Sequence, residues 1–170
     1  MTGTEPAWYV GCVRSCQEKQ TSLLLSSRGV EHYLPLRREV RRWSDRRKVV
    51  EVPVLPRFIF IHCLNSERSE LLAGIPYLCR FLSNPGTGSA AVVRDAELDS
   101  FRQMVEYGGR PVNFVQQSLA PGDRVRVVDG PLTGLECELV SVGSGRCLAV
   151  RLGLLGTATV DLELDSVEKI

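Results

Sequence analysis

The chain has 170 residues, enough for one large domain or two small ones and too few for a multidomain enzyme. Its 44% hydrophobic and 24% charged residues are typical of a globular protein and exclude wholesale disorder. The net charge of +1 hides an asymmetry, because residues 1–110 carry an excess of Lys and Arg and residues 111–170 an excess of Asp and Glu. No apolar run approaches the roughly 18–20 residues that span a bilayer, and the first residues lack a signal pattern. We therefore expect a cytoplasmic protein that does not contact membranes.

The first predicted elements alternate between strand and helix. Residues 8–13 form a short β-rich run, and residues 17–28 have apolar residues at helical spacing up to a stop at Gly29. Ser15, followed three residues later by Glu18, is typical of a capping box. We therefore expect Ser15 to cap the first helix.

Further strands and two more helices follow. Residues 30–40 are β-rich, and so are both halves of residues 49–63, VVEVPV and RFIFIHC; Pro53 and Pro56 between the halves indicate a bend. The remaining expected elements are a helix over 66–73, strands over 77–82 and 91–93, and a helix over 95–107. The order β-α-β-β-α-β-β-α favours an α/β sandwich with a mainly antiparallel sheet.

The composition changes in the last third of the chain. Residues 119–170 contain four short alternating β patterns separated by glycine-rich turns, and only a small, SH3-like β-barrel fits about 50 residues of that kind. We therefore expect an α+β protein. Its N-terminal domain spans residues 1–108, its linker 109–118 and its barrel 119–170.

Six cysteines raise the question of a disulfide framework, a metal site or a catalytic thiol. They include no C-x-x-C pair, and the chain has only two histidines, so we expect neither a metal nor a cofactor. Cys63 and Cys79 lie in apolar strand patterns and are expected to be buried. A nucleophile at Cys12 or Cys16 would need a histidine partner that the sequence does not place there. No catalytic residue is assigned, and the chain is not expected to be an enzyme.

The start of the predicted barrel has a turn, a strand and a tight loop in close succession. Pro121 precedes the turn, and the two loop glycines allow the backbone to reverse before the next strand. The pattern resembles the KOW motif of ribosomal proteins and transcription elongation factors, with Leu132 in place of the loop aromatic and Cys137 in place of a glycine. The matching positions are Gly122, Asp123, Val125, Gly130 and Gly134. We expect Asp123 to accept local backbone N–H groups at the turn.

The predicted N-terminal domain carries a second resemblance. W-Y-V at residues 8–10, V-P-V-L-P-R-F-I-F-I at 52–61, Arg80-Phe81 and Val92-Val93 resemble the NusG N-terminal domain in order and spacing. Together with the KOW pattern, they identify the chain as similar to NusG transcription elongation factors from about residue 8 onward. The stretch from Arg80 to residue 97 is most similar to the specialised RfaH and UpxY antiterminators of surface-polysaccharide operons.

The resemblance implies that an apolar depression of the N-terminal domain receives the clamp helices of the largest RNA polymerase subunit. The matching positions are Leu55, Phe58, Phe60 and Phe81. Phe58 and Phe60 share one face of a strand, and Ile59 and Ile61 share the other. A strand that is apolar on both faces is either fully buried or keeps one face for a partner. Both alternatives remain open at this point.

Residues 37–48 contain seven Lys and Arg against two acidic residues. In NusG relatives this region is a hairpin that reaches upstream DNA, which implies backbone phosphate contacts. The expected contact residues are Arg41, Arg42, Arg46, Arg47 and Lys48. A plain solvated turn is the alternative, and Trp43 either stacks on a base or packs on its own hairpin. Arg14 and Gln17 match positions that contact the non-template DNA strand in RfaH-like proteins.

These features predict a bacterial, monomeric transcription elongation and antitermination factor that binds RNA polymerase and suppresses pausing or termination. The acidic barrel suits a basic partner, and in the family that partner is ribosomal protein S10 or Rho. One rival is a ribosomal or RNA-binding accessory module, in which the barrel itself should be basic. The other rival is an enzyme with a cysteine nucleophile.

Overall fold

Two units make up the structure, a computed structural model that describes residues 4–107, 110–116, 119–162 and 166–170. The first unit ends at Val92 and the second begins at Val93. Both are built on antiparallel sheets with few helices, so the α+β fold class is confirmed. None of the described helices is long and apolar enough to cross a membrane.

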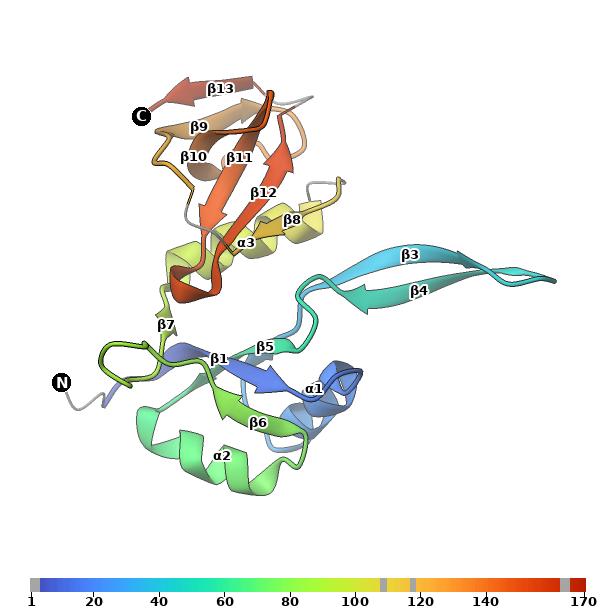
Figure 1. Cartoon of the computed structure of the whole chain (residues 1–170), viewed down its shortest axis with the longest axis vertical. Helices are drawn as coiled ribbons and strands as arrows, with labels where there is room; N and C mark the ends of the chain where they lie inside the picture. Colours follow the sequence, from blue (N-terminus) through green and yellow to red (C-terminus); the bar gives the residue numbers. More distant parts are fainter. Residues whose placement is uncertain (1–3, 108–109, 117–118, 163–165) are drawn as a thin grey trace. The chain divides into compact units, whose positions relative to one another are not determined.

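The first unit has a five-stranded, mainly antiparallel sheet and a separate two-stranded ribbon (Figure 1). In the sheet β5 lies between β2 and β1, β1 lies between β5 and β6, and β7 also pairs with β1. Strands β3 and β4 pair only with each other in the described part of the chain. The elements are β1 (Ala7–Val13), α1 (Glu18–Ser27), β2 (His32–Tyr33), β3 (Leu36–Arg42), β4 (Arg47–Pro53), β5 (Phe58–Cys63), a 3-10 turn (Asn65–Glu67), α2 (Arg68–Gly74), β6 (Leu78–Phe81) and β7 (Val92–Val93).

The core of the first unit lies between the sheet and its two helices, which sit on the same side of it (Figure 1). Ile59 and Ile61 of β5 pack in one cluster with Leu25 of α1 and Leu71 of α2. All four side chains are at most 5% exposed. Burying each of them contributes about 1.5–3 kcal/mol, so this cluster fixes which face of β5 points toward the helices.

Two local expectations for this unit are wrong. The strand predicted over residues 30–40 is split into β2 and β3, because Pro35 has no N–H group to continue the ladder and its carbonyl instead accepts from Val54 N–H at 2.8 Å. The predicted capping box does not form, since Gln17 occupies the N-cap position without a side-chain cap. The carboxylate of Glu18 accepts a hydrogen bond from Arg57 N–H at 2.8 Å.

The burial of Cys63 is confirmed, but Cys79 is exposed. The pairing of β1 with β6 shifts register between Cys12 and Val13, so β6 has one residue more than its partner at this point. Such an irregularity turns two consecutive residues toward the same side. Cys79 and Arg80 are both exposed for this reason, whereas Leu78 stays in the core.

The second unit combines one helix with a curved six-stranded antiparallel sheet, in the strand order β13-β9-β10-β11-β12-β8 (Figure 1). The helix has its expected bounds. It belongs to the second unit, however, and β8 lies inside the segment expected to be the linker. Residues 108–109 and 117–118 of the expected boundary lie outside the described residues. The elements are α3 (Asp95–Tyr107), β8 (Asn113–Val115), β9 (Asp123–Asp129), β10 (Glu136–Val142), β11 (Gly145–Arg151), a 3-10 turn (Gly153–Leu155), β12 (Thr157–Asp161) and β13 (Ser166–Lys169).

Glu138 and Arg151 tie the segment before β9 to the sheet. Arg151 Nε and Nη2 donate to the Glu138 carboxylate at 2.8 and 3.0 Å, and Arg151 Nη2 also donates to the carbonyls of Leu119 and Ala120. Gly122 N–H donates to Glu138 at 3.2 Å. The hydrogen bond from Arg151 lowers the pKa of Glu138 more than burial raises it, and the Gly122 N–H lowers it further.

We expect Glu138→Gln to lower the free energy of unfolding of this unit by about 1–3 kcal/mol at pH 7, because it weakens charged hydrogen bonds. Since the folded pKa is lowered, the stabilisation is present above the ordinary value of 4.5 and is lost as the pH falls below it. Denaturant unfolding from pH 7 to pH 3 measures this, and the variant should show a shallower acid loss than the wild type. If the stability of the wild type and that of Glu138→Gln fell identically with pH, the result would contradict a stabilising role for the Glu138–Arg151 pair.

Candidate functional site

The β3–β4 ribbon, residues 36–53, extends away from the five-stranded sheet of the first unit to a free tip (Figure 1). Its register pairs Leu36 with Pro53 at the base and Arg42 with Arg47 next to the tip. Trp43 N–H donates to the Arg46 carbonyl at 2.8 Å and closes the loop. Every residue from 41 to 49 is exposed, so the ribbon tip has no role in a core.

The charges of the ribbon are balanced at its base and unbalanced at its tip. Near the base, Arg37 lies 3.0 Å from Glu39 and Arg38 lies 4.0 Å from Glu51. Arg41 also lies within 3.8 Å of Glu39. Among the described residues no carboxylate pairs with the remaining cations, which are Arg42, Arg46, Arg47 and Lys48. Free positive charge is therefore concentrated in the last turn of the ribbon.

The register also places like charges opposite one another. Arg41 faces Lys48, and Arg42 faces Arg47. Like charges directly across an antiparallel pair destabilise it, so these four residues do not serve the stability of the ribbon. A chain of phosphates along the ribbon would remove the repulsion, because each phosphate neutralises one cation.

The structure adds a cation that the sequence analysis did not assign. Lys19 of α1 lines a shallow groove of about 460 Å³ together with Arg38, Lys48 and Glu51. Helix α1 thus extends the positive surface of the ribbon toward the body of the first unit. In the sequence, Lys19 is an ordinary charge on a helix, and only the packing of α1 beside β4 reveals its position.

The second candidate surface is the face of the sheet opposite α1 and α2. Cys12 of β1 is the register partner of both Phe58 on β5 and Arg80 on β6, so these three side chains form one row across three strands. Phe58 and Cys12 are partly exposed, and Arg80 is exposed. The row thus presents an aromatic ring to the solvent beside a cation.

Arg57 adds a second cation next to Phe58. It is one of two non-glycine residues with a positive φ among the described residues, at +71°, a conformation that costs energy for a side chain with Cβ. The carboxylate of Glu18, a residue that is 5% exposed, accepts a hydrogen bond from the backbone N–H of Arg57. The backbone carbonyl of Arg57 accepts a hydrogen bond from Val13 N–H at 2.8 Å. Burial raises the pKa of the Cys12 thiol, whereas the positive charges of Arg80 and Arg57 act to lower it.

The four predicted polymerase contacts do not all lie on one face of the sheet or share the same exposure. Phe58 is partly exposed, but Leu55 is 3% exposed and Phe60 is completely buried. Phe81 packs in the cluster under the helices, since it faces Gly11 and Ile59 on the opposite side of the sheet. A binding surface on the face that carries Phe58 therefore cannot also include Phe81.

Arg14 and Gln17 lie together in the connection between β1 and α1. Gln17 N–H donates to the Arg14 carbonyl at 3.1 Å, and Arg14 N–H donates to the Tyr77 carbonyl at 3.0 Å. The Arg14 side chain is exposed, and Gln17 is partly exposed. Both are accessible at the start of α1, the helix that also carries Lys19.

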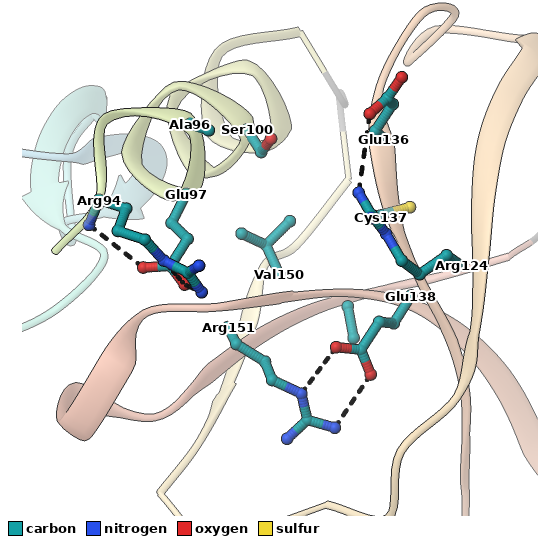
Figure 2. A pocket seen from close by; sticks show the side chains of 11 residues that line it. Arg94, Ala96, Glu97, Ser100, Arg124, Glu136, Cys137, Glu138, Val150 and Arg151 are labelled. Carbon is teal, nitrogen blue, oxygen red and sulfur yellow. Dashed lines mark hydrogen bonds and ion pairs between the residues drawn. The ribbon is translucent and has the colours of Figure 1, made fainter. Parts of the chain in front are cut away.

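The cavity of the second unit, about 420 Å³, lies between α3 and the sheet (Figure 2). Each of its arginines already faces a carboxylate: Arg94 pairs with Glu97 at 2.6 Å, Arg124 with Glu136 at 3.8 Å, and Arg151 with Glu138 (Figure 2). A charged ligand would have to break one of these pairs. The unpaired cations of the ribbon are better placed to bind an anion.

Two of the cysteines, Cys63 and Cys147, are buried and are poor candidates for a nucleophile. Burial raises the pKa of Cys63 to about 11, and it also raises the pKa of Cys147. Both thiols are therefore protonated at neutral pH, whereas a nucleophilic cysteine needs its thiolate form.

The KOW-like residues occupy the start of β9 and the loop before β10. Gly122 is required by space, because a Cβ at this position would lie 2.1 Å from the Leu139 carbonyl oxygen. Gly130 and Gly134 have φ of +110° and +91°, which glycine alone adopts readily. Asp123 pairs with Lys169 of β13 at 3.0 Å, across the sheet instead of within its own turn. The side chain of Val125 is buried, 3% exposed.

Comparison with known proteins identifies the family to which the chain belongs. The family model described as transcription termination factor nusG matches residues 6–102, more than half of the chain. No curated protein matches the chain significantly. Among solved structures, one described as domain interaction in Thermotoga maritima NusG is 20% identical, with 98% of each chain covered and a TM-score of 0.51.

A second similar structure is described as conformation A of the MjSpt4:Spt5 complex, at 14% identity, 92% coverage of this chain, 99% coverage of the other and a TM-score of 0.34. The first similarity shows the fold alone, and the family model supplies the identification over the first unit and the start of α3. The family comprises non-enzymatic transcription factors. The chain belongs to the NusG family of transcription factors.

Proposed function

We propose that this NusG-family chain is a cytoplasmic, monomeric transcription elongation and antitermination factor that docks on RNA polymerase through the face carrying Phe58. The observation that carries the proposal is the row of Phe58, Cys12 and Arg80, which stays accessible on the side of the sheet away from α1 and α2. An aromatic ring flanked by arginines is typical of the residues that dominate protein interfaces. The clamp helices of the largest polymerase subunit are the partner that the family resemblance implies.

The second part of the proposal concerns nucleic acid. The ribbon contacts upstream DNA through Arg42, Arg46, Arg47 and Lys48, with Arg41 in a lesser role because of its nearby carboxylate. Arg14 and Gln17 contact the non-template strand beside α1. Holding the polymerase and the DNA together suppresses pausing and termination, since both events require the complex to rearrange.

The finer assignments extend the same proposal. The similarity of residues 80–97 to RfaH and UpxY proteins supports a specialised antiterminator of surface-polysaccharide-type operons. The KOW-like barrel carries a net negative charge, which suits a basic partner such as ribosomal protein S10 or a surface of Rho. Pull-down of each candidate by the full chain, with polymerase absent, tests this recruitment.

We expect Phe58→Ala to weaken binding to core RNA polymerase about tenfold, because it removes an aromatic side chain from a contact surface. Core enzyme without DNA isolates the protein contact from the ribbon. Leu23→Ala, which removes a 64% exposed side chain from α1, is the matched control and should bind like the wild type. Readthrough of a terminator in single-round transcription should fall with Phe58→Ala. Unchanged polymerase affinity of a folded Phe58→Ala protein would contradict docking through this face.

A further inference from the structure

We propose that Trp43 at the ribbon tip is a stacking site for an unpaired nucleobase, so that the ribbon binds a strand at the point where it leaves a duplex. This inference rests on the proposed nucleic-acid function of the ribbon and adds the form of the ligand. The juxtaposition that carries it is an exposed indole ring surrounded by cations that have no carboxylate partner in the described residues.

Most of the Trp43 side chain lies outside the packing of the ribbon. Trp43 is 62% exposed, and only its backbone N–H closes the loop. The other tryptophan shows the usual arrangement: Trp8 is 7% exposed and stacks on His62 with ring centroids 4.9 Å apart. Any packing of Trp43 on its own hairpin therefore leaves most of the side chain uncovered. A large aromatic surface left in water is available to a ligand.

The surroundings of the ring determine the chemistry of that ligand. Arg42 precedes Trp43 in the chain, Arg46 is bonded to it through the backbone, and Arg47 lies opposite Arg42. Cations that follow a phosphate backbone, combined with an aromatic ring for a base, are the two components of single-strand binding. A positive surface without an aromatic ring would suffice for duplex phosphates alone.

The ring also discriminates between forms of nucleic acid. Inside a duplex both faces of each base are covered by its neighbours, so an indole finds a free base face only at an end, a bubble or a fork. Single-stranded DNA and single-stranded RNA share this chemistry, an unpaired base flanked by phosphates. Arg42 and Arg47 reach the duplex side of a fork equally well, because their contacts do not depend on bases.

The test measures the binding of the full chain to four labelled oligonucleotide probes of equal length: duplex DNA, the same duplex with an open fork, single-stranded DNA and single-stranded RNA. We expect Trp43→Ala to weaken binding to the fork and to the single strands at least about fivefold and to leave duplex binding within about twofold. Trp43→Phe should retain most of the affinity. Tyr107→Ala, which removes an aromatic ring of similar exposure (65%), is the control and should change nothing.

Fluorescence gives a direct readout of stacking. Single-stranded DNA should quench the tryptophan emission of the wild type and leave that of Trp43→Phe unchanged, because the remaining Trp8 is buried. Quenching and selective loss on unpaired probes together support the proposal, and a preference for DNA or for RNA identifies the source of the strand. Equal loss on the duplex and the fork, or no loss on either, overturns it.

The outcome separates this inference from the proposed function. If Arg42→Ala/Arg47→Ala weakens binding to every probe and Trp43→Ala weakens none, the ribbon binds nucleic acid and only the stacking is wrong. If the wild type binds none of the probes at low salt, both proposals are wrong.

Discussion

Replacing Phe60 with alanine is expected to lower the free energy of unfolding of the first unit by about 3–5 kcal/mol. Phe60 is completely buried at the centre of β5, faces Val10 on β1 and stacks on Tyr33 with ring centroids 6.2 Å apart. Truncation removes this contact area and leaves a cavity on this face of the sheet, which the neighbouring side chains fill only in part. The loss approaches the whole stability of a typical small domain.

Denaturant unfolding followed by tryptophan fluorescence measures this change, because both tryptophans lie in the first unit and Trp8 is buried there. Phe58→Ala, two residues away on the same strand face, is the matched control and should cost about 1 kcal/mol, since its ring is already partly exposed. Equal losses for the two variants would contradict the assigned burial. The comparison also matters for function, because a loss of polymerase binding is informative for Phe58→Ala and ambiguous for Phe60→Ala.

The double variant Arg42→Ala/Arg47→Ala is expected to weaken DNA binding about 30-fold at 0.15 M salt and to make the slope of log affinity against log salt shallower by about 1.8. The reason is counterion release: each lost duplex phosphate contact removes about 0.9 from the slope. The effect should be nearly equal on unrelated DNA sequences, because backbone contacts carry no base information. Titrations of the elongation complex at several salt concentrations, on two non-template sequences, measure it.

Arg37→Ala/Arg38→Ala supplies the matched control, because it removes the same net charge from the base of the same ribbon. Those two arginines already pair with Glu39 and Glu51, so we expect a smaller change of the slope. Polymerase binding without DNA should be unaffected by either double variant. Equal slopes for the tip variant and the wild type would leave the ribbon as a solvated hairpin, and a loss on one DNA sequence alone would indicate base readout instead.

Sequence periodicity was sufficient to predict a helix or a strand wherever the element is determined by the pattern of its own residues. The spacing of Leu98, Phe101 and Met104 predicted α3 with the bounds the structure has, and all three side chains are at most 1% exposed. The apolar run of β5 and the alternating valines of β9 likewise predicted strands. These patterns succeed because one face of a helix or a strand must be apolar to be buried, whatever it packs against.

The same patterns did not predict features that depend on partners far along the chain. The Glu18 carboxylate accepts a hydrogen bond from the backbone N–H of Arg57, 39 residues away, and so it does not form the capping box. Cys79 is exposed because the pairing of two strands shifts by one residue, and no local pattern encodes that shift. Residues 113–115, expected in a linker, form β8 because β12 offers an edge to pair with.

For the candidate site, the sequence by itself determined the composition of the ribbon, with seven basic residues among twelve and a tryptophan between them. It also determined that β5 is apolar on both faces. Only the tertiary structure decided which of these residues is available. The carboxylates of Glu39 and Glu51 neutralise the base of the ribbon and leave its tip charged, and the register around Gly11 places Phe81 under the helices and Phe58 on the accessible face. Charge pairing and strand register are relations between distant residues, and so they emerge only when the chain is folded.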